Sequence, residues 1–344
     1  MRTITLCLIG FGNVGRAFAR LLLRKEKTLA QEFDLHILVT GILTGRHGRA
    51  IDSGGINLTR ALEMAEDGLP LTTLSADPEA PDGPAFVYAC PAQVLLENTP
   101  VNHNTGQPAI ACLRAGLEKG MHAITANKGA VVFGYSQLRA LAEERGRRFL
   151  FESAVMDGAP IFSLFRGPLP AIELRGFHGI LNSCTNLLLE QMENGRSYAE
   201  AIAYAQSIGI TETDPSADVD GWDAAIKVAA LSTVLFGIPL TPQQVERQGI
   251  RELTAEQLRE AHQAGKRWKL VCSAERRGGQ LLHARVAPQC IGPESPLFSV
   301  QGTSSFVQFH SDVLPGLGIL ESNPGPETTA YGLLADLLNA LRGA

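Results

Sequence analysis

An apolar run at Thr3–Ile9 leads directly into the glycine pattern Gly10-Phe-Gly12-Asn-Val-Gly15, and a helical pattern follows from about residue 17. Each glycine has its own task in such a strand–turn–helix unit. The first allows the tight turn, the second lets the backbone approach a pyrophosphate, and the third lets the helix pack on the strand. The alternative is a glycine turn that binds no ligand. Because the pattern joins an expected strand to an expected helix, we favour a dinucleotide site at the helix N-terminus.

The first part of the chain alternates between strand and helix patterns, which is typical of a doubly wound parallel sheet. The run at residues 85–89 is read as a buried strand that ends at Cys90-Pro91. In full, we expect strands at residues 3–9, 35–43, 85–89, 122–125 and 148–152, and helices at 58–66, 108–119 and 135–144.

After about residue 159 the pattern changes to runs of strands and runs of helices, which predicts an α+β domain. We expect strands at residues 171–181, 280–286 and 305–310, and helices at 186–193, 198–207, 222–236 and 327–341. We therefore predict an α/β protein in which a Rossmann dinucleotide-binding domain occupies residues 1–134. A second, catalytic domain is expected at residues 135–314.

Composition excludes several classes of protein. A length of 344 residues suits two domains. The net charge is -5 and no long basic run occurs, so we expect no nucleic-acid partner. No apolar stretch reaches the ~18–20 residues that span a bilayer, so we expect no membrane segment. The six cysteines form no CxxC pair and no signal peptide precedes the first strand, which favours the reducing cytoplasm.

The second expected strand indicates which nicotinamide cofactor is bound. NAD sites usually carry an acidic residue at its end, where it bonds the ribose 2′-hydroxyl. Here the strand ends in Leu43-Thr-Gly-Arg46-His47, which contains no acid. Arg46 and His47 suit a 2′-phosphate instead, although Arg46 is alternatively a solvated loop residue. The pattern favours NADP(H) over NAD(H).

Five carboxylates and one lysine fall within the segment Glu212–Lys227. We expect a loop up to Asp220, which is a good N-cap for the helix that follows. Asp223 then lies in the first turn of that helix, and Lys227 shares its face four residues later. Such a cluster can hold an ammonium group and place a lysine beside a reacting hydroxyl. The alternative is a common surface pair, worth only ~0.3–0.5 kcal/mol.

Four segments resemble motifs of the homoserine dehydrogenase family, in the family's order. They are Thr125-Ala-Asn-Lys128, the stretch Gly179-Ile-Leu-Asn-Ser-Cys-Thr-Asn186, the stretch from Thr211 to Leu231 that contains the acidic cluster, and Gly325-Pro-Glu-Thr-Thr-Ala330. With the glycine turn they span nearly the whole chain. The last of them resembles the turn at which the family's chain returns to the cofactor, which implies that the C-terminal segment 315–344 completes the Rossmann domain. The length resembles a short form that lacks the ACT domain or the aspartate kinase fusion of many relatives, so we expect no feedback control through those modules.

The resemblance implies the interconversion of L-aspartate 4-semialdehyde and L-homoserine with NAD(P)H, in a homodimer. Lys227 and Lys128 are implied to act in proton transfer at the reacting oxygen. The implied substrate-binding residues are Glu212, Asp218, Asp223, Asn182, Ser183 and Cys184. The expected cofactor-binding residues are Gly10, Gly12, Asn13, Val14, Gly15, Arg46, Cys90, Pro91, Asn127, Glu327 and Thr328.

The segment from residue 152 to 159 resembles the family segment implicated in binding a monovalent cation, Na⁺ or K⁺. The implied ligands are one carboxylate together with backbone carbonyls, and oxygen donors suit such a hard cation. The expected residues are Glu152, Val155, Asp157 and Ala159. No histidine and cysteine pattern suggests a zinc site.

Three departures from the family pattern bear on the substrate. Ser183-Cys184 replaces Gly-Thr, Ile210 stands where some members carry tyrosine, and Met156-Asp-Gly158 replaces a smaller stretch. A bulkier pocket wall can shift discrimination by ~1–3 kcal/mol. Two other functions therefore stay open: a dehydrogenase of another small hydroxy amino acid, and a non-catalytic NADP-binding sensor. Retention of the lysines and acids named above argues against the sensor.

Overall fold

The computed structural model describes residues 1–76, 83–211, 213–278 and 282–342. The chain forms two compact units, Met1–Pro160 with Gly325–Ala344, and Ile161–Pro324. Among the described residues, no helix is both long and apolar enough to cross a membrane.

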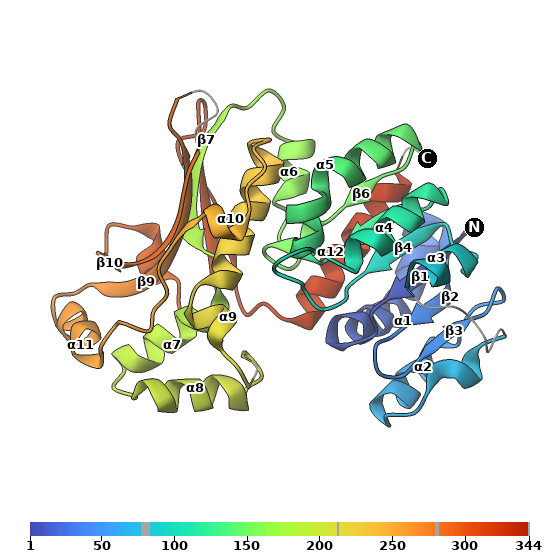
Figure 1. The fold of residues 1–344 in the computed structure, drawn as a ribbon, viewed down its shortest axis with the longest axis horizontal. Helices are drawn as coiled ribbons and strands as arrows, with labels where there is room; N and C mark the ends of the chain where they lie inside the picture. Colours follow the sequence, from blue (N-terminus) through green and yellow to red (C-terminus); the bar gives the residue numbers. More distant parts are fainter. Residues whose placement is uncertain (77–82, 212, 279–281, 343–344) are drawn as a thin grey trace. The chain divides into compact units, whose positions relative to one another are not determined.

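The first unit is built on a six-stranded sheet with the order β3-β2-β1-β4-β5-β6 (Figure 1). All neighbours are parallel except β2 and β3. The strand order reverses between β1 and β4, which makes the carboxyl ends of these two strands the topological switch point. The strands are β1 Arg2–Ile9, β2 Leu35–Leu43, β3 Arg49–Ile51, β4 Val94–Glu97, β5 His122–Thr125 and β6 Phe149–Leu150.

The last helix of the chain returns to this first sheet. In Figure 1 it lies, in red, beside the blue helix α1, and the two helices are in contact. Leu333 and Leu337 of α12 share one apolar core with Phe18 of α1 and Leu8 of β1. The helices of this unit are α1 Asn13–Phe33, α2 Leu58–Glu66, α3 Gly83–Ala89, α4 Ala109–Glu118, α5 Lys128–Glu144 and α12 Pro326–Leu341, with short 3₁₀ turns η1 Leu71–Leu74 and η2 Glu152–Ala154.

The expected strand at residues 85–89 is wrong. This segment is helix α3, and the strand of this part of the sheet is β4, Val94–Glu97. Short apolar runs do not distinguish a strand from a buried helix. Pro84 stands at the start of α3, a favourable place for proline, and the exposed Tyr88 follows the buried Val87.

The two units differ in extent from the domains expected from the sequence. The boundary expected at residue 134 falls inside α5, because that helix begins at Lys128 rather than at Tyr135. The boundary expected at residue 315 precedes β12, Leu317–Glu321, which belongs to the second sheet. The first unit therefore ends at Pro160 and resumes at Gly325.

The second unit contains a six-stranded sheet with the order β12-β11-β7-β9-β10-β8. Its neighbours are antiparallel except β8 and β10. Helices α7, α10 and α11 contact β9. The further strands of this sheet are β7 Leu174–Ile180, β8 Glu246–Arg247, β9 Arg267–Arg276, β10 Leu282–Ile291 and β11 Ser305–Ser311. The helices of this unit are α6 Phe162–Arg166, α7 Ser183–Glu193, α8 Tyr198–Ser207, α9 Ser216–Val219, α10 Trp222–Leu235 and α11 Ala255–Gln263. Two short 3₁₀ turns are η3 Pro242–Gln244 and η4 Pro296–Ser299.

Helix α12 is held by close backbone contact at Gly332. A Cβ at this position would lie 2.2 Å from Ser153 Oγ and 2.8 Å from the carbonyl oxygen of Asp157. Because a backbone atom cannot move aside cheaply, we expect Gly332→Ala to lower the free energy of unfolding by about 1–3 kcal/mol. Urea denaturation measures this. Gly325→Ala is the matched control, since a Cβ there meets nothing within 4 Å, and equal loss in both variants would contradict the packing argument.

Candidate active site

The glycine turn lies at the carboxyl end of β1, and its glycines differ in what surrounds them. Gly10 has φ +97°, and a Cβ there would lie 2.5 Å from Asn98 Oδ1. A Cβ at Gly15 would lie 2.4 Å from the carbonyl oxygen of Gly10. At Gly12 nothing lies within 4 Å of that position. The first and third glycines therefore serve packing, while the second leaves the backbone open to a ligand.

Gly12 is also the N-cap of α1, a helix whose first turn contains no acidic residue. The first N–H groups of a helix have no intrahelical acceptor, and the helix dipole adds positive potential there. Asn13 accepts a hydrogen bond from Arg16 at 3.0 Å, and Val14 packs against the core of the unit. An open backbone at a helix N-terminus fits the pyrophosphate of a dinucleotide.

Asn98, which we did not predict, completes this turn. Its backbone N–H donates to the carbonyl oxygen of Ile9 at 2.8 Å. Its side-chain Nδ2 and Oδ1 atoms are buried and have no hydrogen-bond partner among the described residues. A buried amide without partners beside an open turn fits a ligand that supplies polar groups. The misplaced strand at residues 85–89 hid this residue, because Asn98 directly follows the true strand β4.

Cys90 and Pro91 were expected to bind the cofactor because they followed that misplaced strand. In the structure both precede β4, so they do not lie at a carboxyl end. Cys90 is buried with its Sγ 3.7 Å from Thr40 Oγ1, and the carbonyl oxygen of Pro91 accepts from the same hydroxyl at 3.1 Å. Cys90 is thus part of the packed interior, whereas Pro91 is exposed and its carbonyl oxygen makes this contact.

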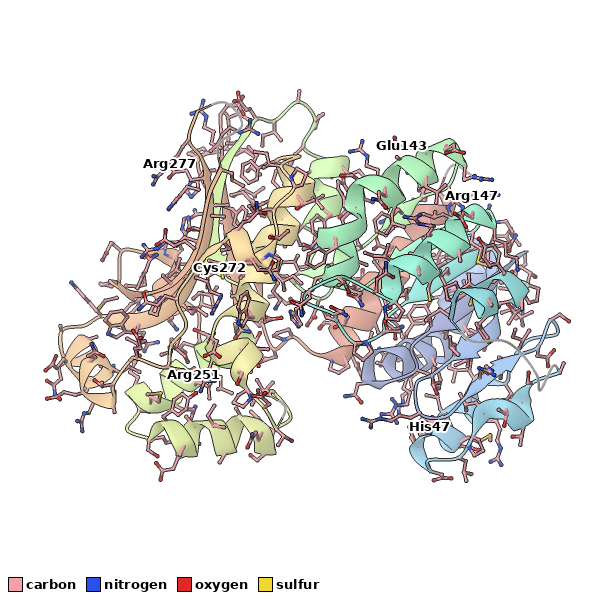
Figure 2. All side chains as sticks on the ribbon, viewed as in Figure 1. His47, Glu143, Arg147, Arg251, Cys272 and Arg277 are labelled. Carbon is pink, nitrogen blue, oxygen red and sulfur yellow. The ribbon has the colours of Figure 1, made fainter. Side chains whose placement is uncertain are left out.

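Arg46 and His47 lie in the tight turn that joins β2 to β3. The turn is closed by the N–H of Thr44 on the carbonyl oxygen of Gly48 at 2.9 Å, and by the N–H of His47 on Thr44 Oγ1 at 2.6 Å. Arg46 is exposed, and His47 is labelled in Figure 2. The cationic side chain of Arg46 therefore stands at the carboxyl end of β2, where the adenosine ribose binds in this fold.

Asn127 acts as a structural cap. Its Oδ1 accepts from the N–H groups of Gly129 and Ala130, and its Nδ2 donates to the carbonyl oxygen of Thr99 at 3.2 Å. The side chain is thus occupied by the protein and fixes the start of α5. Lys128 is the first residue of that helix and is half-buried. Asn127 therefore fixes the position of Lys128.

The segment expected to bind a cation packs against the start of α12. Glu152 and Val155 are buried, and the N–H of Glu152 donates to Asp336 Oδ2 at 2.7 Å. Asp157 has both carboxylate oxygens turned to α12, where Thr329 Oγ1 donates at 2.8 Å and Thr328 Oγ1 lies at 3.3 Å. Asp157 therefore clamps the helix that carries Thr328.

Thr328 and Glu327, two expected cofactor residues, lie in the first turn of α12. Thr328 Oγ1 accepts from the N–H of Gly325 at 2.8 Å. Glu327 is exposed and pairs with Arg24 of α1 at 3.5 Å. Ala159, the remaining expected cation residue, is buried, and its N–H donates to the carbonyl oxygen of Met156 at 2.8 Å.

In the second unit, Asn182 joins the two acidic residues expected to bind substrate. Its Nδ2 donates to Asp218 Oδ1 at 2.7 Å and to Asp223 Oδ2 at 2.9 Å. Its Oδ1 caps α7 by accepting from the N–H and Oγ1 of Thr185, at 2.7 and 2.8 Å. Both hydrogens and the oxygen of the amide are thus in use. Asn182 therefore holds the two carboxylates in place.

Lys227 and Asp223 form the expected pair on α10. Their side chains are 3.0 Å apart and only 16% and 15% exposed, which excludes an ordinary surface pair. Lys227 Nζ also donates to the carbonyl oxygen of Leu181 at 2.7 Å. The ammonium group is therefore held by the carboxylate of Asp223 and the carbonyl oxygen of Leu181. Cys272 of β9, labelled in Figure 2, is fully buried, and burial raises the pKa of its thiol to about 12.

Asp218 is the second carboxylate of this network. Burial raises the pKa of Asp218, and the neighbouring charge of Asp223 raises it further, while the hydrogen bond from Asn182 lowers it. Thr211 Oγ1, which we did not predict, donates to Asp218 Oδ2 at 3.1 Å. Two carboxylates joined through one amide are complementary to an incoming cation such as an ammonium group.

The two residues that depart from the family pattern flank this network. Burial, followed by the charge of Asp218, raises the pKa of the Cys184 thiol to about 12, so the thiol is neutral. Ser183 is half-buried, with its Oγ 3.2 Å from Ser305 Oγ. Ser183 thus adds side-chain bulk where the family has glycine, and neither residue adds a charge.

Asp220 does not cap α10, which corrects that expectation. The N-cap is Gly221, with φ +79°, and Asp220 instead ends the short helix α9 within the expected loop. Its carboxylate bonds to Arg251, labelled in Figure 2, whose Nη2 also donates to Ser216 Oγ at 3.0 Å. The carboxylate of Asp220 is therefore paired with Arg251 and not with Lys227. Glu212, an expected substrate residue, lies outside the described residues.

Two family models match the chain. The one described as homoserine dehydrogenase, NAD binding domain, matches residues 10–152. The one described as homoserine dehydrogenase matches residues 160–338.

Individual proteins are similar over nearly their full length. A protein from Pseudomonas canavaninivorans, named NAD(+)-dependent homoserine dehydrogenase, is 32% identical over 351 residues, which cover 100% of this chain and 98% of the relative. The crystal structure of a candidate homoserine dehydrogenase from Archaeoglobus fulgidus has a TM-score of 0.85 at 28% identity and 98% coverage of each chain. A hyperthermophilic archaeal homoserine dehydrogenase mutant in complex with NADPH has a TM-score of 0.83 at 27% identity and the same coverage.

Proposed function

Because the chain belongs to the homoserine dehydrogenase family, we propose how its residues interconvert L-homoserine and L-aspartate 4-semialdehyde with a nicotinamide cofactor. The chain is an NAD(P)-dependent oxidoreductase that acts on a CH–OH group. The observation that carries the residue roles is the network of Asp218, Asn182, Asp223 and Lys227, which joins one ammonium group to two carboxylates.

Lys227 is the proposed proton donor in reduction and the proton acceptor in oxidation. A carbonyl that becomes an alkoxide needs a nearby cation and then a proton, and the reverse reaction uses the same group. Asp223 and the carbonyl oxygen of Leu181 orient the ammonium group for this task. Lys128, fixed at the start of α5 by Asn127, is the proposed second lysine at the reacting oxygen. The cofactor, when bound, supplies or accepts the hydride.

The substrate's ammonium group is the proposed partner of Asp218, together with Glu212. Asp218 and Asp223 repel each other through the network, and an ammonium ion relieves that repulsion. Asn182 and Thr211 hold the carboxylates in place, and Ser183 and Cys184 form a neutral wall beside them. This arrangement favours an amino acid substrate over a simple alcohol.

We expect the KM for L-homoserine to rise as the pH falls through the raised pKa of Asp218. Only the ionised carboxylate attracts an ammonium ion, and burial makes this group take up its proton at a higher pH than an ordinary aspartate. Asp218→Asn should give a high KM that no longer changes in this range, measured by initial rates at saturating cofactor. Asp220→Asn is the control, because Arg251 already holds that carboxylate. A wild-type KM independent of pH would contradict the role of Asp218.

A substrate panel tests the assignment of homoserine despite the Ser183-Cys184 departure. We expect kcat/KM to be highest with L-homoserine among hydroxy amino acids that are one carbon shorter or longer. The double variant Ser183→Gly, Cys184→Thr, which restores the family pattern, should retain homoserine activity within about tenfold, the range that one pocket wall controls. Better turnover of the longer substrate by the wild-type chain would point to the other hydroxy amino acid.

NADP(H) is the proposed preferred cofactor, because Arg46 stands at the end of β2 where an acid is usual in NAD sites. The relatives include both an NAD(+)-dependent enzyme and an NADPH complex, so the choice rests on this residue. We expect Arg46→Ala to raise the Kd of NADPH about tenfold and that of NADH less than twofold, since only NADPH carries the 2′-phosphate. Fluorescence titration measures both. Equal changes would discard this contact.

A monovalent cation, Na⁺ or K⁺, is proposed at Glu152 and the carbonyl groups of Val155 and Ala159, with Asp157 engaged by α12. A rate that is independent of K⁺ and Na⁺ after exhaustive dialysis would remove this proposal. A homodimer and a cytoplasmic location remain proposals that the family and the cysteine pattern favour. Sedimentation equilibrium decides the oligomeric state.

A further inference from the structure

Glu97 is a buried acid that the roles above leave unused. It is the last residue of β4, it pairs in register with Ile9 of β1 and with Thr125 of β5, and it is 0% exposed. Ile9 directly precedes the glycine turn. Glu97 is therefore a buried residue at the carboxyl ends of β1 and β4, the switch point at which this fold binds a dinucleotide.

Hydroxyl groups and a backbone N–H surround the carboxyl group of Glu97. The N–H and the hydroxyl of Thr99 donate to Oε1, the former at 2.9 Å. Thr125 Oγ1 lies 2.6 Å from Oε2 and itself accepts from the N–H of Asn127, which leaves its own hydrogen for the carboxylate. Burial has the largest effect and keeps the pKa of Glu97 above its ordinary value, although these hydrogen bonds lower it in part. All of these partners are neutral, so they do not cancel the charge.

A neutral glutamine has nearly the same shape and also accepts hydrogen bonds from Thr99. Burying a carboxylate in its place carries a large desolvation cost. A merely structural clasp therefore does not account for the charge. A negative charge at this edge affects the two redox forms of a nicotinamide cofactor differently. The oxidised nicotinamide ring carries a positive charge and the reduced ring is neutral, and Coulomb attraction is strong where water is excluded.

We propose that Glu97 is a buried counter-charge that stabilises the oxidised nicotinamide cofactor relative to the reduced one. The residue acts through space, from beneath the strand ends, while Asn98 beside it faces the glycine turn. The inference rests on the proposed function, because it requires that a nicotinamide cofactor binds at this edge. Through this charge, Glu97 shifts the equilibrium between the bound oxidised and reduced cofactor. That equilibrium sets how readily homoserine is oxidised.

The test compares the Kd values of NADP⁺ and NADPH in the wild-type chain and in Glu97→Gln, by isothermal titration without substrate. We expect the Kd of NADP⁺ to rise about tenfold and that of NADPH to change less than twofold, as expected for loss of one buried charge. Glu97→Asp, which keeps the charge, should keep most of the wild-type ratio of the two Kd values.

The ratio separates the possible outcomes. A variant that weakens both forms equally would show a structural clasp and overturn the inference, as would a ratio unchanged in Glu97→Gln. If Glu97→Gln does not fold, Thr125→Val removes one donor from the carboxylate and should shift the ratio in the same direction by a smaller factor; an unshifted ratio there overturns the inference. A wild-type chain that binds neither form would instead contradict the proposed function.

Discussion

Replacement of Lys227 by alanine is expected to lower kcat for L-homoserine oxidation by about a thousandfold, with the Kd of NADPH changed less than twofold. The ammonium group of Lys227 is held by Asp223 at 3.0 Å and by Leu181 at 2.7 Å, and alanine removes both the cation and the proton carrier. Stopped-flow and steady-state absorbance of the reduced nicotinamide give the rate, and fluorescence titration gives the Kd.

Two controls make that loss interpretable. Lys266→Ala removes an exposed lysine from the same unit and should leave kcat unchanged. Lys227→Ala leaves the mostly buried Asp223 without its cation, so part of any loss can come from disturbed packing. The double variant with Asp223→Asn removes that charge. If it recovered near-normal kcat, or if Lys227→Ala alone retained it, Lys227 would have no part in proton transfer.

Gly12→Val is expected to abolish cofactor binding without loss of stability. Gly12 has φ -79°, which any residue adopts, and nothing lies within 4 Å of the position of its Cβ. The protein has room for valine, but the side chain would occupy the space where a pyrophosphate approaches the backbone. We expect the Kd of NADPH to rise at least about a hundredfold while the thermal midpoint stays unchanged, because the charge-assisted contacts at the helix N-terminus are lost.

The neighbouring glycine gives the contrast. Gly15→Val would place a Cβ 2.4 Å from the carbonyl oxygen of Gly10, so it should destabilise the fold itself. Calorimetry of both variants separates the two kinds of glycine. Normal NADPH affinity in Gly12→Val would mean that the turn does not carry the pyrophosphate.

The features predicted correctly from the sequence are those specified by residues close together in the chain. The glycine turn needs only a strand, six residues and a helix, and the pairing of Asp223 with Lys227 follows from helical spacing. The return of the last helix to the first sheet was expected from the family resemblance, and its amphipathic pattern made it visible. The homoserine dehydrogenase family was also identified from such a resemblance, through motifs that are spread along the whole chain.

The elements and contacts that the sequence does not predict depend on residues that are far apart in the chain. The run at residues 85–89 has the composition of a strand, but burial of Phe86 and Val87 on one side makes it a helix. With the strand expected at residues 85–89, Cys90 was the residue expected at its carboxyl end, whereas Asn98 follows the true strand β4. Asn127 and Asn182 belong to family motifs, yet the sequence does not reveal that their amide N–H groups donate to distant partners: Thr99 for Asn127, and Asp218 and Asp223 for Asn182.

The central claim is that this chain oxidises L-homoserine with a nicotinamide cofactor bound at the glycine turn. The most direct measurement is the initial rate of L-homoserine oxidation at alkaline pH, with NADP⁺ and NAD⁺ in parallel, on protein shown by titration to bind NADPH. We expect a robust rate that is higher with NADP⁺. Binding of NADPH with no homoserine oxidation by either cofactor would contradict it.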